Sequence, residues 1–287
     1  MKKSIFISLL IMFLSVSSIW AKTYGLSYET ILKYSSSKIE ENYSTEFIEE
    51  EYYKEKIPAE YADAFLYYTR NFKNKSTFRR NFYSIMVHES NNFTSFVHKN
   101  ADGSVDKGPS QLNSNNIKNP TFRKYYNPKD ESRITSVYCF YMVMTINFYY
   151  DLVSKYGEKY AFYAYNGGER VVKLVKNNEN IEDPRKESLL NQVRIYDSKV
   201  RNKLAFINSE IESYINNYKA IKVVELASEI MSDLYHNELS PTLLKNICKF
   251  GDNNLFYIRR EDFTYFEFEE VGIICNPSIG GFEVQTA

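Results

Sequence analysis

The clearest constraint on the fold is a run of apolar side chains separated by three and four residues in the last third of the chain. Its members are Leu204, Ile207, Ile211, Tyr214, Tyr218 and Ile221. This spacing places them on one face of an α-helix that extends toward Tyr235. Such a helix either packs back on its own domain, which we favour, or pairs with a second copy in a coiled coil. The small number of helix breakers, 10 Gly and 7 Pro in 287 residues, also favours a mainly α-helical protein.

The N-terminus has the pattern of a signal peptide. Two lysines precede an apolar run from Ile5 to Val16, and the small residue Ala21 follows at a suitable cleavage point. We therefore expect residues 1–21 to be removed and the mature chain to be exported to the periplasm or cell envelope. The alternative is a retained membrane anchor, so the sequence leaves open whether the mature protein is free or tethered.

Charge and cysteine content exclude several classes of function. Without the two lysines of the signal peptide, 34 basic side chains stand against 36 acidic ones, a net charge of −2. This balance gives no electrostatic footprint for nucleic acid. The three cysteines have neither Cys-x-x-Cys nor zinc-type spacing, so we expect no metal and no organic cofactor. If one disulfide forms after export, we favour Cys248 with Cys275 and a buried thiol at Cys139, although all three pairings stay open.

Residues 22–74 form a charged, tyrosine-rich segment that we expect to support packing and to carry no chemistry. The pattern predicts two or three short helices, the clearest of which begins after Pro58 and runs toward Phe72. The run Ser35–Ser37 is expected to interrupt the helical pattern.

A helix predicted near residues 77–90 carries an apolar stripe that ends on an acidic residue. The stripe consists of Phe78, Phe82, Ile85 and Met86. Glu89 lies eleven residues after the first of these, almost three helical turns, and therefore projects from the same face. A carboxyl group that is desolvated in this way has a raised pKa, which favours the protonated acid. The alternative is a glutamate at a fraying helix end that points into solvent.

The remaining segments alternate between loops and helices. The polar stretch 98–120 predicts turns and not a strand or a helix, and a loop of this length is usually functional. Helices are predicted over residues 134–156, 160–165 and 189–200. Gly157 is expected to end the first of them and Asn166-Gly167-Gly168 the second. In the tail, residues 253–270 have the pattern of a short β-hairpin.

Four short motifs follow one another between residues 75 and 203. They are Glu89-Ser90 at a helix end, NADGSVDKGPSQLN with Gly108 and Gln111 three positions apart in a Gly-x-x-Gln pattern, AYNGG at 164–168, and Tyr196 with Val200 in IYDSKV. In this order and spacing they resemble the SLT-type (soluble) lytic transglycosylases, relatives of goose-type lysozymes that cut bacterial peptidoglycan. Each motif is weak alone, and the four together carry the resemblance.

The resemblance implies a lysozyme-like domain over residues 75–203, preceded by the helical segment 22–74. A C-terminal extension, residues 204–287, would then contain the long helix and the hairpin. The substrate and partner implied is a peptidoglycan glycan strand, cleaved at the β-1,4 bond between N-acetylmuramic acid and N-acetylglucosamine.

The resemblance also implies the chemistry. Glu89 would be the single catalytic acid, which protonates the glycosidic oxygen and then takes the proton of the muramic C6 hydroxyl. That oxygen closes on C1 and leaves a 1,6-anhydro end. Contacts with the substrate or with Glu89 are implied for Ser90, Gln111, Tyr165, Asn166 and Tyr196.

Some residues depart from the family pattern or lie beside it. Pro109-Ser110 stand where the family usually has an apolar pair, which bears on substrate affinity. His88 is expected on the opposite side of the helix from Glu89. Asp102 and Asp106 are interpreted as turn residues, but either one could position water if it faced the cleft.

Two further hypotheses follow from these departures. One is a lysozyme-type hydrolase that uses the same acid with water as the nucleophile. The other is a catalytically weak glycan-binding or assembly protein, whose helix after Leu204 docks a partner in an envelope complex. The oligomeric state is left open by the sequence.

Overall fold

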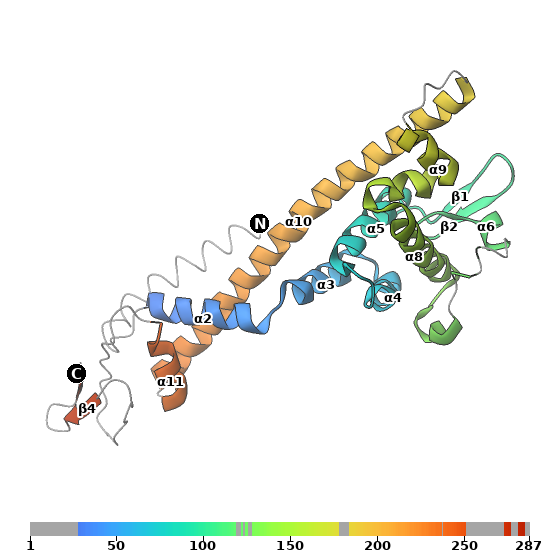
Figure 1. Cartoon of the computed structure of the whole chain (residues 1–287). Coiled ribbons are helices and arrows are strands. Elements are labelled where there is room, and N and C mark those ends of the chain that lie inside the picture. Colours follow the sequence, from blue (N-terminus) through green and yellow to red (C-terminus); the bar gives the residue numbers. More distant parts are fainter. Residues whose placement is uncertain are drawn as a thin grey trace. The chain divides into compact units, whose positions relative to one another are not determined.

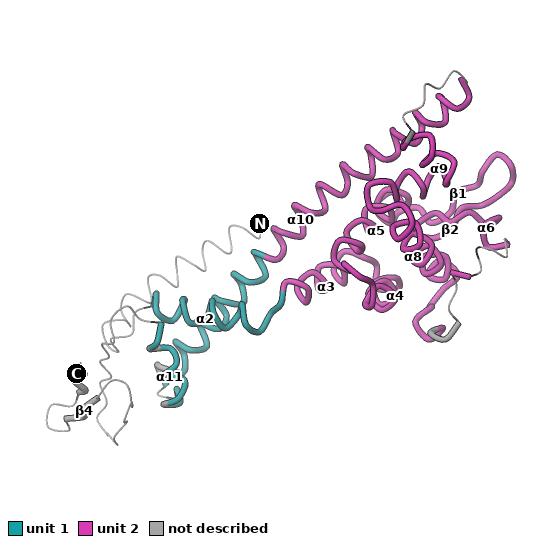
Figure 2. Tube along the Cα trace, viewed as in Figure 1, with its two compact units in different colours: residues 1–44, 216–287 teal, residues 45–215 magenta. Residues whose placement is uncertain are grey.

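Figure 1 shows the computed structural model of the chain. It describes residues 28–118, 122, 124–125, 128–177, 184–236, 238–250, 273–276 and 281–284. The signal peptide predicted over residues 1–21 and the hairpin predicted over residues 253–270 lie outside this part of the chain. The described residues are mainly α-helical, as predicted, and the chain divides into two compact units, residues 1–44 with 216–287 and residues 45–215 (Figure 2).

The larger unit contains most of the helices and a small sheet. Its helices are α3 (Thr45–Lys56), α4 (Ala59–Thr69), α5 (Lys75–Glu89), α6 (Ser114–Lys118), the 3₁₀ helix η1 (Pro128–Arg133), α8 (Val137–Tyr156), α9 (Glu158–Asn177) and the first part of α10 (Pro184–His236). Its strands are β1 (Val97–Lys99), β2 (Val105–Lys107) and β3 (Leu112–Asn113). The predicted domain limits after residues 74 and 203 differ from the limits of the units, and the second lies inside α10.

The smaller unit is built from both ends of the chain. Its elements are α2 (Tyr28–Asn42), the end of α10, α11 (Pro241–Cys248) and the antiparallel strands β4 (Ile273–Asn276) and β5 (Gly281–Val284). Three helices share one apolar core made of Ile31, Tyr34, Ala227, Ile230, Leu244 and Ile247. The predicted interruption at Ser35–Ser37 is wrong, because α2 continues through all three serines. Packing of the apolar face outweighs the modest helix propensity of serine.

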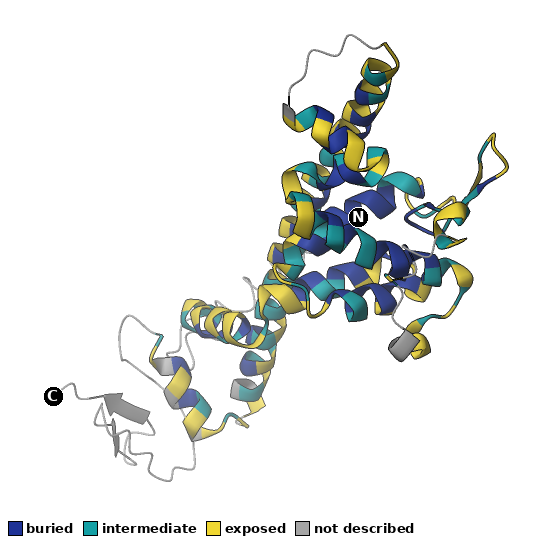
Figure 3. Cartoon of the chain, turned by 45° about the vertical axis from the view of Figure 1, so that its right-hand side comes forward, coloured by how far each residue is buried: buried dark blue, intermediate teal, exposed yellow. Residues whose placement is uncertain are grey.

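Aromatic side chains fill the core of the larger unit, where most residues of α5 are buried. Buried residues are drawn in dark blue in Figure 3. Phe82 is fully buried, and its ring centroid lies 6.0 Å from that of Phe78, 6.4 Å from that of Phe65 and 5.9 Å from that of Tyr149. Ile85 and Met86 are fully buried as well. The apolar stripe predicted for this helix is therefore confirmed.

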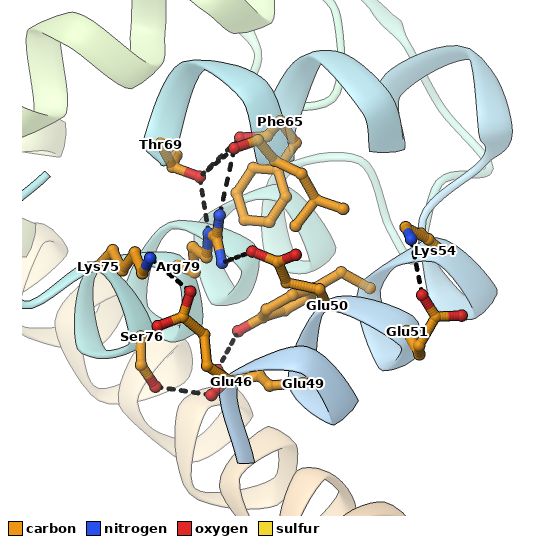
Figure 4. Close-up of polar contacts among 12 residues, drawn as sticks. Glu46, Glu49, Glu50, Glu51, Lys54, Phe65, Thr69, Lys75, Ser76 and Arg79 are labelled. Atoms are coloured by element: carbon orange, nitrogen blue, oxygen red, sulfur yellow. Dashed lines mark hydrogen bonds and ion pairs between the residues drawn. The ribbon is translucent and has the colours of Figure 1, made fainter. Parts of the chain in front are cut away.

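A buried arginine joins α5 to two neighbouring helices (Figure 4). The side chain of Arg79 is 1% exposed. Its guanidinium donates to the hydroxyl of Thr69 at 2.8 Å, to the carbonyl oxygen of Leu66 at 3.2 Å and to the carboxylate of Glu50 at 2.8 Å. Because a buried cation must be paired, these bonds fix the position of α5 relative to α3 and α4.

The prediction of turns without strands over residues 98–120 is wrong. β1, β2 and β3 form an antiparallel sheet in that order, with Lys99 opposite Val105 and Asp106 opposite Asn113. The β1–β2 connection turns at Gly103, whose φ is 82°. Strands of two or three residues are too short to show alternation, although the Asp-Gly pair at the turn is a hairpin signal.

The helices after the sheet agree with the predicted helix ends at some positions and differ from them at others. Gly157, with φ 76°, ends α8 as predicted, but α8 begins only at Val137 because the Ser136 side chain caps it. Gly168, with φ 71°, kinks α9 where a stop was predicted, and the helix then resumes as far as Asn177. The helix predicted over residues 189–200 is one part of α10.

The apolar run that begins at Leu204 packs back on its own chain. Ile207 and Ile211 are buried, and the ring of Tyr214 lies 5.4 Å from that of Tyr52 in α3. The favoured alternative is thus confirmed for this part of α10. Cys139 is a buried free cysteine, as expected, whereas the side chains of Cys248 and Cys275 lie outside the described structure. No described helix is long and apolar enough to cross a bilayer.

Candidate active site

The backbone enters the left-handed region two residues after Glu89, the last residue of α5. Asn91, Asn92 and Phe93 have φ angles of 49°, 58° and 61°, which lie in the left-handed region. Asparagine tolerates this region, but phenylalanine rarely adopts it. The amide of Asn92 donates to the carbonyl oxygen of Val87 at 2.9 Å, which fixes the turn. The end of α5 is therefore a defined termination, and Glu89 does not belong to a fraying end.

The carboxyl group of Glu89 is held by a tyrosine from α10. The hydroxyl of Tyr196 donates to Oε1 of Glu89 at 2.7 Å. Desolvation raises the pKa of Glu89 to about 7, the charge of Asp106 adds to the increase, and the bond from Tyr196 opposes it. Glu89 keeps part of its surface in contact with solvent. The raised pKa predicted from the apolar stripe is confirmed.

Tyr196 also contacts the residue before the acid. The imidazole of His88 lies edge-on to the Tyr196 ring, with centroids 5.2 Å apart and an angle of 74°. Burial, and the nearby charges of Lys199 and Lys203, lower the pKa of His88. The expectation that His88 turns away from the site is wrong, because it touches the tyrosine that binds Glu89. A neutral imidazole in this position fixes the ring of Tyr196 from one side.

The Gly-x-x-Gln segment is anchored to α9 by Tyr165. The Tyr165 hydroxyl donates to the carbonyl oxygen of Ser110 at 2.6 Å. Burial raises the pKa of this tyrosine, and the charge of Glu89 adds to the increase. Gly108 has φ 79°, and a Cβ there would lie 2.9 Å from the carbonyl oxygen of Tyr138. Glycine is therefore required at this position. Ser110 is fully buried, so it does not form part of the cleft surface.

Gln111 folds back on the same segment. Its φ is 49°, and its side-chain amide donates to the carbonyl oxygen of Gly108 at 2.8 Å. This bond holds the loop in shape and leaves the side-chain carbonyl oxygen, on a half-buried residue, available to a ligand. Tyr165 and Gln111 thus both act on the loop that connects β2 to β3.

Two of the predicted binding residues do not join this cluster. Ser90 is fully buried, and its hydroxyl donates to the carbonyl oxygen of Met86 at 2.6 Å and accepts from the amide of Phe93 at 2.8 Å. The hydroxyl therefore closes the end of α5 and is not accessible to a sugar. Asn166 is exposed on α9, just before the kink at Gly168. The Asn166 side chain is therefore accessible to solvent or to a ligand.

Asp106 was interpreted as a turn residue, but it lies in β2 and acts on the site. Asn113 donates to its Oδ1 at 2.7 Å and also to the hydroxyl of Ser104 at 2.9 Å. The charge of Asp106 raises the pKa of both Glu89 and Tyr165. A second carboxylate therefore acts electrostatically on the acid. The sequence signal that places Asp106 in a strand is Val105-Asp106-Lys107 after a hairpin turn. Asp102 is a turn residue, as predicted.

The cluster suits acid–base chemistry near neutral pH. A general acid is most effective when its pKa lies near the working pH, which is the case for Glu89. The bond from Tyr196 occupies Oε1, so the proton of the neutral acid resides on Oε2 and can be donated. Among the described residues, no group of three or more His, Cys, Asp or Glu side chains could hold a metal ion.

The chain was compared with models of protein families, with curated proteins and with solved structures. None of the three comparisons gave a match. The chemistry of the cluster around Glu89 is therefore the basis on which a function can be argued.

Proposed function

We propose that this protein is an exported lytic transglycosylase that cuts the glycan strands of peptidoglycan with Glu89 as its catalytic group. The observation that carries the proposal is a carboxyl group with a pKa of about 7 at the end of a buried helix, bound by Tyr196. The four sequence motifs support it, because two of their residues, Tyr165 and Gln111, order the loop near the acid.

The first step breaks the glycosidic bond. Glu89 donates the proton on Oε2 to the oxygen between N-acetylmuramic acid and N-acetylglucosamine, and the C1–oxygen bond breaks with its electron pair on the leaving oxygen. Positive charge develops at C1, and the carboxylate left on Glu89 stabilises it. Tyr196 supports this ionised form, because it donates a hydrogen bond to the same carboxylate.

The second step closes the product. The Glu89 carboxylate takes the proton of the C6 hydroxyl, and the C6 oxygen forms a bond to C1. The acid is thereby regenerated, and the glycan carries a 1,6-anhydro end. No second carboxylate is required for this sequence, in contrast to most glycosidases.

Asp106 favours a second candidate, a hydrolase with the same acid. A carboxylate that acts on Glu89 from a neighbouring strand could accept a proton from water, and the hydroxide so formed would attack C1. The bond from Asn113 to Oδ1 leaves Oδ2 of Asp106 for such a water. The two candidates differ in their products, because the hydrolytic product contains one additional water.

The test of this function is to incubate the mature chain, residues 22–287, with purified peptidoglycan and to analyse the soluble fragments by mass spectrometry. Glu89→Gln keeps the shape of the acid and removes its proton, and Glu55→Gln, at an exposed position, is the matched control. Anhydro fragments from wild type and control, and none from Glu89→Gln, are expected. Reducing ends would favour the hydrolase, and equal cleavage by all three proteins would exclude Glu89 from the mechanism.

A further inference from the structure

A polar pocket of about 580 Å³ lies among α5, α9 and α10. Its volume falls within the range of small-molecule sites, roughly 300–1,000 Å³. The residues that line it belong to the larger unit, and none of them belongs to the cluster around Glu89. The pocket is therefore a separate feature of the same unit.

Two asparagine side chains in the pocket have no partner among the described residues. Asn81 is only 6% exposed, and no hydrogen bond within the described chain reaches its amide group. The side-chain oxygen of Asn208 is buried and likewise lacks a partner within the described chain. Buried polar atoms in folded proteins are almost always paired. The Asn208 oxygen therefore points to a ligand that donates a hydrogen bond, and the amide of Asn81, which lines the same pocket, can both donate to such a ligand and accept from it.

The charges around the two amides offset one another. The guanidinium of Arg80 binds the carboxylates of Glu49 at 3.0 Å and Glu212 at 3.2 Å. Arg201 binds Asp197 at 2.9 Å. Because the two arginines are already paired, and because Lys159 and Glu158 in the lining carry opposite charges, the pocket offers oriented polar groups with little net attraction for an anion. This lining favours a neutral ligand.

We propose that the pocket binds a neutral saccharide. Sugar hydroxyls donate and accept hydrogen bonds at once, which is what the unpaired amides of Asn81 and Asn208 require. Phe162 adds apolar lining, and the guanidinium carbon of Arg201 lies 5.2 Å from its ring centroid. A second saccharide site would hold a glycan strand away from the bond that is cut. That role rests on the proposed function, whereas the binding itself does not.

The test is a titration of full mature Glu89→Gln protein with tri-N-acetylglucosamine and with maltotriose, followed by backbone amide NMR. Saccharide binding is expected to shift the amide signals of Ser76 and Lys159, which line the pocket. Asn208→Ala should raise the Kd obtained from these shifts roughly tenfold, which is the effect of one lost hydrogen bond. Asn202→Ala, at an exposed position on the same helix, should leave it unchanged.

The outcomes separate the two proposals. A response to both sugars indicates recognition through hydroxyl groups. A response to tri-N-acetylglucosamine alone indicates that the acetamido group is recognised as well. Either outcome supports a saccharide site in the pocket. Shifts confined to position 89 and to Gln111, or a pocket response unaffected by Asn208→Ala, overturn it. If wall cleavage is absent while the pocket signals still shift, the proposed enzyme fails and the saccharide site stands.

Discussion

Three environmental effects act on the proton of Glu89, and they come from three different elements. Desolvation by the packing around the end of α5 is the largest, and the charge of Asp106 on β2 acts in the same direction. The hydrogen bond from Tyr196 on α10 acts against both. Because the hydrogen bond and the charge belong to separate side chains, Tyr196 and Asp106, each of these two effects can be removed by one substitution.

Tyr196→Phe is expected to move the basic limb of the pH–activity profile to higher pH. The substitution removes the only one of the three effects that lowers the pKa of Glu89, so the protonated acid persists further into the alkaline range. The measurement is the initial rate of peptidoglycan solubilisation between pH 5 and about 9. A limb that stays near pH 7 or moves down would contradict the role assigned to the bond.

Asp106→Asn is expected to move the same limb to lower pH. The amide has the shape of the carboxylate but lacks the charge that helps to raise the pKa of Glu89. Asp102→Asn is the matched control, since Asp102 is exposed and bonds only within its own turn. The profile is measured as for Tyr196→Phe, and equal profiles for the two variants would remove Asp106 from the site.

Glu89→Gln is expected to stabilise the protein at alkaline pH. The folded-state pKa of about 7 lies above the ordinary value of 4.5, so the stability linked to the proton is complete below pH 4.5 and lost as pH rises through 7. At pH 8 we expect a gain of about 1–3 kcal/mol in the free energy of unfolding, reduced because the side chain is partly exposed. Denaturant unfolding at pH 4 and 8 measures it, and an equal gain at both values would contradict the linkage.

At the scale of elements, α9 packs tightly against α10 at a glycine. A Cβ at Gly167 would lie 2.6 Å from a methyl group of Val171 and 2.8 Å from a methyl group of Val193 on α10. Gly168, the next residue, has open space around it but a φ of 71°. The two neighbouring glycines are therefore needed for different reasons, one for space and the other for backbone conformation.

Gly167→Ala is expected to reduce both stability and activity, because the displaced α10 carries Tyr196. Overpacking of this kind costs about 1–3 kcal/mol. Gly168→Ala should cost about 1 kcal/mol through its backbone alone and leave the site intact. Thermal unfolding and wall solubilisation compare the two, and an activity loss confined to Gly168→Ala would reverse this assignment.

The sequence predicted those elements whose patterns extend over several turns. The stripe of α5 and the buried face of α10 each repeat over many residues, so they predict structure without knowledge of contacts. Gly157 predicted the end of α8 for another reason, because glycine tolerates the positive φ found there. The sheet escaped prediction because its strands are too short to repeat. Asp106 and His88 were misplaced for a related reason, because only the pairing of β2 and the position of α10 decide what they touch.

At the scale of the whole chain, every residue of the candidate site belongs to the larger unit. Ile230→Ala is therefore expected to destabilise the smaller unit by about 2–5 kcal/mol, since it opens a cavity in the core of α2, α10 and α11. Cleavage of peptidoglycan at 25 °C should persist. Calorimetry and activity assays test this, and loss of activity in parallel with the core would show that the site depends on both units.

The core of the smaller unit also has a consequence for how the chain is made. Ile31 and Tyr34 leave the ribosome early, but their partners on α10 and α11 follow only about 200 residues later. At roughly 5–20 residues per second, the apolar face of α2 waits for about 10–40 s before its partners exist. During that interval the apolar face of α2 is exposed. We therefore expect a chaperone that binds the nascent protein to bind it at this helix.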